Sequence, residues 1–123
     1  MINKNILKHA RHGLTENEIY NAYKIFFGTL VSESRLKIIN LLRKKVANVS
    51  EIIKELKADQ TSISHDLARL KRCGFVQVET KGKYRYYSLN EKTIKPLMVL
   101  IDEHMAHYCI HILHGMKGGH NGE

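Results

Sequence analysis

The chain of 123 residues lacks the features of secreted and membrane-spanning proteins. Cys73 and Cys109 are its two cysteines, too few for a disulfide framework and suited to a reducing compartment. No apolar run approaches the ~20 residues that a membrane span needs, and the longest, "PLMVLI" at 96–101, is far shorter. The start, "MINKNILKHARHG", lacks the apolar stretch and cleavage site of a signal peptide. These absences predict a cytoplasmic protein without a membrane partner.

Catalytic motifs are absent as well. The sequence has no nucleophile elbow, phosphate-binding loop, HExxH or paired carboxylate motif. Nothing in it indicates the open coordination position in a cleft that a zinc hydrolase needs. We therefore expect a protein that is not an enzyme.

Acidic side chains are few. Twelve Asp and Glu stand against twenty Lys and Arg, a formal net charge of +8 at pH 7. A basic chain without a basic amphipathic helix or lipid motif points first to nucleic acid, because cations that neutralise phosphates release counterions; solubility alone is the alternative. The hydrophobic fraction of 43% allows a core. We expect one domain over residues 1–115, helped by dimerisation, and a flexible tail over 116–123.

Local capping patterns predict helices in the first half of the chain. Two capping boxes, in which an N-cap side chain and a Glu three residues later exchange hydrogen bonds with the backbone, open helices at Thr15–Glu18 and Asn48–Glu51. Ser32 or Ser34 opens a helix between them, and residues 3–12 favour a short one.

A further helix is predicted over 61–73, "TSISHDLARLKRC". Its Ile63, Leu67 and Leu70 form one narrow apolar stripe at helical spacing. Gly74 ends it as a C-cap. This helix therefore buries one side and leaves the other to solvent.

A hairpin and a last helix complete the chain. Residues 75–80 and 83–89 read as two strands joined around Lys81-Gly82. A long apolar helix is predicted over 90–114, with Pro96 in its first turn. Four helices, a β-hairpin and a long C-terminal helix make the expected fold α+β.

The helix over 61–73 follows a short capped helix and a tight turn, an order typical of a helix-turn-helix. Its polar side carries short donors and acceptors and arginines, which approach base edges and phosphates in a major groove. An ordinary amphipathic surface helix is the alternative. The basic tip of the hairpin indicates a winged helix-turn-helix instead. The predicted DNA-contacting residues are Gln60, Thr61, Ser62, Ser64, His65, Arg69, Arg72, Lys81, Lys83 and Arg85.

Three segments carry a family resemblance: "SRLKIINLL" (34–42), "DQTSISHDLARLKRCGFV" (59–76) and "GKYRYYSL" (82–89). They resemble the ArsR/SmtB family of winged-helix repressors, over about residues 30–107. The resemblance implies a homodimer, joined by its first and last helices, that binds a pseudo-palindromic double-stranded DNA operator and is released by an inducer. In many members the inducer is a metal ion. Some members sense thiol oxidation or persulfides, and others have no known ligand.

The resemblance also implies where a metal would bind. The family's Cys-x-Cys motif falls on Asn48 and Ser50 here, so sensing of soft metals by thiolates at that site is not expected. The family's site on the last helix falls on Glu91, Thr93, His104 and His107. The threonine lacks ligand chemistry, so the implied set has three of its four members.

Four histidines in the last helix also indicate a metal site without any family. His104, His107, His111 and His114 follow one another at spacings of 3, 4 and 3, on one helix face where imidazoles can share a Zn, Ni, Co or Cu ion. A polar coiled-coil seam is the alternative, although four unpaired imidazoles on a buried seam are costly. Cys109 falls on the opposite face and is expected to be a buried apolar residue.

We therefore predict a repressor whose operator binding is relieved by a transition metal, Zn or Ni before Co or Cu. The ion would bind these four histidines and Glu91 across the dimer. Weaker ligand candidates are His9, His12 and His120. A thiol response through Cys73 and Cys109 stays open, and so does a metal-buffering protein that does not bind DNA.

Overall fold

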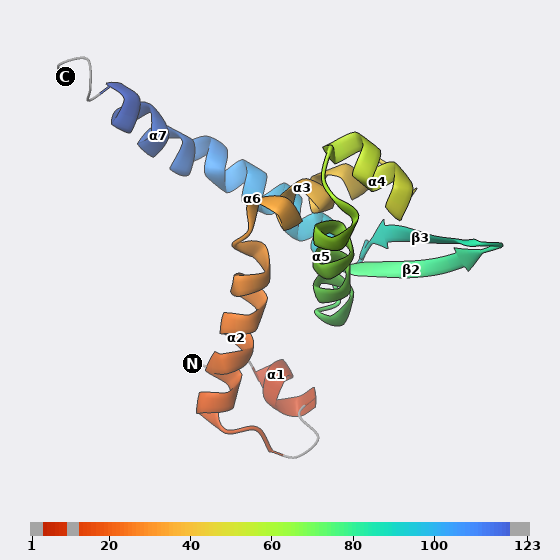
Figure 1. Ribbon diagram of the computed structural model, residues 1–123. Coiled ribbons are helices and arrows are strands. Elements are labelled where there is room, and N and C mark those ends of the chain that lie inside the picture. The colour runs from red at the N-terminus through yellow and green to blue at the C-terminus, as the bar shows by residue number, and fades with distance from the viewer. Residues whose placement is uncertain (1–3, 10–12, 119–123) are drawn as a thin grey trace. The chain divides into compact units, whose positions relative to one another are not determined.

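The structure, a computed structural model, describes residues 4–9 and 13–118 (Figure 1). In chain order its elements are α1 (Lys4–His9), α2 (Glu16–Leu30), α3 (Glu33–Leu42), β1 (Ala47–Asn48), α4 (Val49–Leu56), α5 (Gln60–Arg72), β2 (Val76–Lys81), β3 (Tyr84–Leu89), α6 (Ile94–His107) and α7 (Cys109–Gly118). The chain divides into two units, of which the first ends at Ser88 and the second begins at Leu89. None of the described helices is long and apolar enough to cross a membrane. The first unit has the predicted winged helix-turn-helix, with α4 and α5 as its helix pair and the β2–β3 hairpin as its wing.

Side-chain caps set where α2 and α4 begin. The Thr15 hydroxyl accepts a hydrogen bond from the Glu18 N–H at 3.2 Å, and the Glu18 carboxylate accepts one from the Thr15 N–H at 2.9 Å. Asn48 and Glu51 exchange the same two bonds at 2.8 and 2.9 Å. Both predicted capping boxes are confirmed, and the second one fixes the first helix of the helix-turn-helix.

The starts of α3 and α5 rest on single caps. Of the two serines predicted to open α3, Ser32 is the N-cap. α5 begins at Gln60, because the Asp59 carboxylate accepts a hydrogen bond from the Ser62 N–H at 3.0 Å. In the turn before it, Lys57 has a φ of 53°, a left-handed conformation that residues other than Gly rarely adopt. The angle between α4 and α5 is thus set by a strained turn and a carboxylate cap.

The core of the first unit is built from α3, α4, α5 and the start of the wing. Ile63, Leu67 and Leu70 of α5 are 2%, 1% and 0% exposed, so the predicted apolar stripe is confirmed. Fully buried residues elsewhere in the unit include Ile38, Ile39, Ile52 and Phe75. Burial of this stripe stabilises α5 against the unit and leaves the opposite side of the helix in solvent.

The sheet has three strands in the order β1-β3-β2, one strand more than the sequence predicted. β1 is antiparallel to β3, with Ala47 opposite Tyr87 and Asn48 opposite Tyr86. Its two residues are too short to show a strand pattern. Because Asn48 also caps α4, this pairing joins the start of the helix-turn-helix to the wing. The hairpin of β2 and β3, which turns at Gly82 with a φ of 63°, projects away from α5 (Figure 1).

The prediction of one continuous C-terminal helix over 90–114 is wrong. α6 ends at His107 and α7 begins at Cys109, and Tyr108 between them has φ −126° and ψ −75°. No Gly or Pro stands at this break, so no local residue type indicated it. Pro96 lies in the first turn of α6, as predicted. Cys109 is exposed, so the expectation that it is buried is also wrong.

Candidate nucleic-acid interface

The outer face of α5 is exposed along the helix. Its members are Gln60, Thr61, Ser62, Ser64, His65, Ala68, Lys71 and Arg72. Within the described part of the chain, His65, Lys71 and Arg72 have no hydrogen-bond or ion-pair partner for their side chains. The predicted set omitted Lys71, although its spacing of two helical turns from Ser64 places it on this face. The face offers short polar groups in its first half and cations in its last turn.

Ser62 has a local role at the start of this face. Its N–H and its hydroxyl donate hydrogen bonds to the two carboxylate oxygens of Asp59, at 3.0 and 2.8 Å. The backbone bond from Ser62, followed by the side-chain bond, lowers the pKa of the Asp59 carboxyl from its ordinary value of 3.8. Ser62 therefore fixes the first turn of α5 through Asp59.

Arg69 lies on a different side of α5 from the other predicted DNA-contacting residues. Its Nε donates to the Thr29 hydroxyl of α2 at 3.2 Å, and the side chain is half-buried. Its guanidinium fills the space beside Gly28, where an added Cβ would lie 3.3 Å from the Arg69 Nη2. Arg69 therefore connects α5 to α2 and does not belong to the outer face, unlike the predicted residues Ser64 and His65.

Asp66 is a buried acid on the inner side of α5 that sequence reasoning missed. Its carboxylate accepts a hydrogen bond from the Ser34 hydroxyl at 2.6 Å and pairs with Arg35 at 3.3 Å. Arg35 also donates to the backbone oxygens of Thr29 and Gly28, at 2.8 and 3.1 Å. Charged groups this far from water need such partners. The network fixes the recognition helix to α2 and α3.

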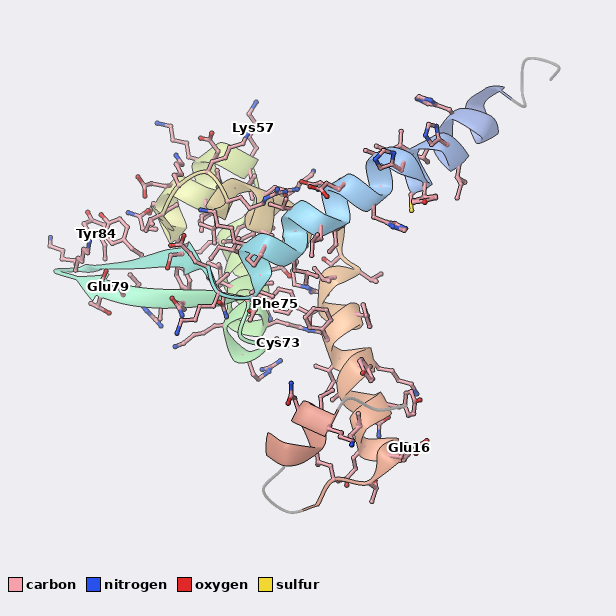
Figure 2. All side chains as sticks on the ribbon, turned by 180° about the vertical axis from the view of Figure 1, so that it is seen from behind. Glu16, Lys57, Cys73, Phe75, Glu79 and Tyr84 are labelled. Atoms are coloured by element: carbon pink, nitrogen blue, oxygen red, sulfur yellow. The ribbon has the colours of Figure 1, made fainter. Side chains whose placement is uncertain are left out.

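The wing carries three predicted cations in two different settings. Lys81 lies 3.7 Å from the Glu79 carboxylate, so its charge is partly neutralised within the hairpin. Lys83 and Arg85 are exposed and have no ion-pair partner among the described residues. Figure 2 shows Tyr84 near the tip of the hairpin and Glu79 farther along it. Lys83 and Arg85 are therefore the wing cations whose charge is not matched within the described part of the chain.

The C-terminal histidines are exposed in the second unit. His104 and His107 belong to α6, whereas His111 and His114 belong to α7. The rings of His104 and His107 lie 4.6 and 6.4 Å from that of Tyr108 at the break. No three or more His, Cys, Asp or Glu side chains of the described chain are close enough to hold one metal ion. The described residues of one chain therefore bring together at most two such side chains, fewer than the three or four ligands of a protein metal site.

Of the remaining predicted ligands, the structure describes the side chain of Glu91. Glu91 precedes α6, and its carboxylate lies 3.3 Å from the Lys95 ammonium. The side chain of His9 lies outside the described residues, as do His12 and His120.

The two cysteines are free thiols in different surroundings. The Cys73 sulfur lies 3.2 Å from the buried Thr29 hydroxyl, next to the base of the wing (Figure 2). It is half-buried, whereas Cys109 is exposed on α7. Cys73 thus joins the contacts between α5 and α2, and Cys109 is open to solvent.

Known proteins share this arrangement. The model of the bacterial regulatory protein arsR family matches residues 32–78, from the cap of α3 into β2. An uncharacterized HTH-type transcriptional regulator of Methanocaldococcus jannaschii is 33% identical over 87 residues, which cover 70% of this chain and 98% of that protein. The range matched by the family model includes both helices of the helix-turn-helix, α4 and α5.

Solved structures agree with the sequence matches. The crystal structure of the transcriptional repressor PagR of Bacillus anthracis has a TM-score of 0.59 at 30% identity, covering 70% of this chain and 99% of that one. A homodimeric winged helix-turn-helix DNA-binding domain of Mycobacterium bovis has a TM-score of 0.65 at 24% identity, covering 79% and 95%. The chain therefore belongs to the ArsR family of DNA-binding transcriptional regulators.

Proposed function

We propose that this regulator is a repressor that binds a pseudo-palindromic operator as a homodimer, with α5 in the major groove. The observation that carries the proposal is the outer face of α5, where His65, Lys71 and Arg72 are exposed and unpaired beside the short side chains of Thr61 and Ser64. Short hydroxyl side chains let a helix approach base edges, and unpaired cations attract phosphates. The similarity to PagR, a transcriptional repressor, supports repression over activation.

Exposed apolar side chains support the homodimer. On α2, Tyr20, Tyr23 and Phe27 are 46%, 39% and 56% exposed, and neighbouring ring centroids lie 5.9 and 6.5 Å apart. In the second unit, Val99 and Leu100 are 46% and 62% exposed. Rows of exposed apolar side chains are typical of interfaces, and the relative from Mycobacterium bovis is a homodimer. A twofold dimer would offer two α5 helices to half-sites about one helical turn apart.

Selection from a pool of random-sequence DNA duplexes tests this function. We expect the purified protein to enrich an inverted repeat with half-sites one helical turn apart. Ser64→Ala and His65→Ala should relax the preference at individual base positions, whereas Lys37→Ala, on α3 and paired with Glu33 at 3.1 Å, should not. Enrichment of no sequence, or of a single half-site by a monomer, would contradict the proposal.

We further propose that a transition-metal ion, Zn or Ni, relieves operator binding through the C-terminal histidines. His104 and His107 are exposed on one side of the break at Tyr108, and His111 and His114 on the other. Imidazole suits these metals. Because one chain supplies only pairs within its described residues, the proposal requires a shell completed by the second subunit. Such an ion shifts repression only if it binds the DNA-free form more tightly than the DNA-bound form.

Metal titration of the protein on its selected operator tests this step. We expect Zn or Ni to lower DNA affinity, and His104→Ala and His107→Ala to remove the effect without changing metal-free DNA binding. Glu91→Gln tests the further predicted ligand. If Zn, Ni, Co and Cu leave DNA affinity unchanged, the metal proposal fails and the DNA-binding function stands.

A thiol response is the second candidate, and the exposure of Cys109 favours it over an inert role for that residue. Peroxide or sulfide would then change operator affinity in the absence of metal. Cys109→Ser should silence such a response and leave a histidine metal response intact.

A further inference from the structure

The last turn of α2 receives polar contacts from both α3 and α5. Thr29 is fully buried there, and its hydroxyl accepts a hydrogen bond from the Arg69 Nε of α5 at 3.2 Å. The Sγ of Cys73, the C-cap of α5 (labelled in Figure 2), also lies 3.2 Å from this hydroxyl. Arg35 of α3 donates to the backbone oxygens of Thr29 and Gly28, at 2.8 and 3.1 Å. We call Gly28, Thr29, Arg35 and Arg69 the Thr29 cluster.

The direction of these bonds holds Arg69 in one place. The Thr29 hydroxyl has one proton, which it donates to the Ile25 carbonyl at 2.8 Å, so toward Arg69 the oxygen acts as an acceptor. Beside the guanidinium, Gly28 has no side chain, and an added Cβ would lie 3.3 Å from the Arg69 Nη2, closer than ordinary van der Waals contact. Arg69 is therefore held between an acceptor and a helix surface that a glycine leaves open.

A second link joins the same turn of α2 to α5 through α3. The Arg35 guanidinium, which donates to the carbonyls of α2, also pairs with Asp66 of α5 at 3.3 Å. Asp66 and Arg69 are three residues apart, so both lie toward the same side of α5. The position of α5 relative to the end of α2 is thus fixed at two points, about one helical turn apart.

The angle between these helices matters if α2 joins two subunits, as its exposed Tyr20, Tyr23 and Phe27 support. The distance between the two recognition helices of such a dimer depends on the α2–α5 connection in each subunit. A dimer of this kind meets half-sites about 34–36 Å apart, one turn of the duplex. Because a change at the connection acts once in each subunit, even a small rotation of α5 changes the spacing that fits.

On the basis of the proposed homodimer with α5 in the major groove, we propose that the Thr29 cluster determines which spacing of half-sites the protein accepts. Gly28 and Thr29 are positioning residues, which act through Arg69 and Arg35 and not by contact with DNA. The sequence of each half-site is read by the outer face of α5, which does not include the cluster. The cluster thus adds a specificity for spacing to the specificity for bases.

Duplexes that carry two half-sites at the selected spacing, or about one base pair closer or farther apart, test the cluster. Thr29→Val keeps the shape of the side chain but removes the acceptor of Arg69. We expect its preference for the selected spacing, a ratio of affinities, to fall about fivefold, as the loss of one hydrogen bond allows. Affinity for a single half-site should stay that of the parent. Because the ratio compares two affinities of one protein, a change in folded fraction cancels.

Two further variants are the controls for Thr29→Val. Thr29→Ser keeps the hydroxyl and should restore the preference of the parent protein for the selected spacing. Ile52→Val removes a methyl group from the buried core of α4, outside the cluster. It should lower stability and leave the spacing preference intact.

Gly28→Ala tests the cluster without removing any hydrogen-bonding group. The added Cβ displaces the Arg69 guanidinium, whereas alanine favours the helix itself more than glycine does. We expect the spacing preference to fall as it does in Thr29→Val. Gly115→Ala, in α7, should keep the preference, because its added Cβ meets no described atom within 4 Å beyond its own helical turn.

The outcomes separate the cluster from the function on which it rests. If the parent protein binds no DNA, or binds two half-sites regardless of their spacing, the proposed dimeric function fails. If the parent prefers one spacing and either Thr29→Val or Gly28→Ala keeps that preference, the assignment of the cluster alone fails. A loss in Thr29→Val that Thr29→Ser shares, or that is as large on a single half-site, would also overturn the assignment.

Discussion

Charged side chains occur on both sides of α5, but they have protein partners on the inner side and none among the described residues on the outer side. On the inner side, Asp66 and Arg69 have partners on α2 and α3, at 2.6 to 3.3 Å. On the outer side, Lys71 and Arg72 have none among the described residues. Arg69 and Arg72 are three residues apart on one helix, yet Arg69 binds Thr29 of α2 and Arg72 faces solvent. The partner, and not the residue type, decides whether a cation contributes to stability or to binding.

A basic helix of this kind can combine a stable fold with affinity for DNA. Inner charges are satisfied within the unit, so they do not compete for phosphates. Outer charges have no partner among the described residues, so they add little to stability, and under the proposed function they would attract the duplex. Substitutions on the inner side should change the free energy of unfolding, and those on the outer side should change DNA affinity.

The largest effect is expected for Asp66→Ala. It leaves the Arg35 guanidinium without its carboxylate in a site where the two side chains are 15% and 12% exposed, and loss of one partner of a buried pair costs about 3 kcal/mol. Urea unfolding should show a fall of that order in the free energy of unfolding. Ser64→Ala, on the outer side of the same helix, should change it by less than about 0.5 kcal/mol. Equal effects of the two variants would remove the distinction between the sides.

Arg69→Ala and Arg72→Ala form a matched pair of smaller effects. Arg69 donates to the Thr29 hydroxyl and packs beside Gly28, so its loss should lower the free energy of unfolding by about 1 kcal/mol. Arg72→Ala should leave stability within about 0.5 kcal/mol and weaken DNA binding. Urea unfolding and DNA titration of both variants check whether Arg69→Ala mainly lowers stability and Arg72→Ala mainly lowers DNA affinity. The comparison breaks if Arg69→Ala weakens DNA binding as much as Arg72→Ala does while stability is unchanged.

A still smaller change is expected in the turn that sets the angle of α5. Lys57 ends α4 with a φ of 53° and makes the C-cap bond to the Ile53 carbonyl. Glycine adopts this conformation without the steric cost of a Cβ, so Lys57→Gly should raise the free energy of unfolding by about 0.5 kcal/mol. Lys57→Ala removes the charge but keeps the Cβ and should not stabilise. If Lys57→Ala raises the free energy of unfolding as much as Lys57→Gly does, removal of the charge and not relief of the backbone is the cause.

Patterns within a few residues predicted most of the first unit. The capping boxes at Thr15–Glu18 and Asn48–Glu51, and the stripe of Ile63, Leu67 and Leu70, depend on neighbours in sequence. These patterns were enough for the order of the helices and the two wing strands and for most of the outer face of α5, but not for β1. Local periodicity is a strong guide where one helix face alone decides the environment.

Features that depend on distant partners escaped sequence reasoning. The ion pair of Asp66 joins residues 31 positions apart, and the bond of Arg69 joins residues 40 apart. A count of basic residues could not tell Arg69 from Arg72. The break at Tyr108 also escaped, because the histidine spacing was measured on a continuous helix. That break divides the four histidines between α6 and α7. The prediction that they share one face held only for a straight, continuous helix.

The smallest effect is expected for the pH dependence of the carboxylate cap at the start of α5. Asp59 is fully exposed, and its hydrogen bonds from Ser62 hold its pKa below the ordinary value of 3.8. A carboxyl whose pKa is lower in the folded state stabilises that state fully above its unfolded pKa, and the contribution is lost as the pH falls through the folded pKa.

Asp59→Asn keeps an N-cap of similar strength but does not titrate. We therefore expect the urea midpoint of the parent protein to exceed that of Asp59→Asn near neutral pH, and this difference to disappear as the pH falls below 3.8. A midpoint difference that stays constant down to acid pH would show that the Asp59 charge does not stabilise α5, and would leave its inner contacts as the source of that stability.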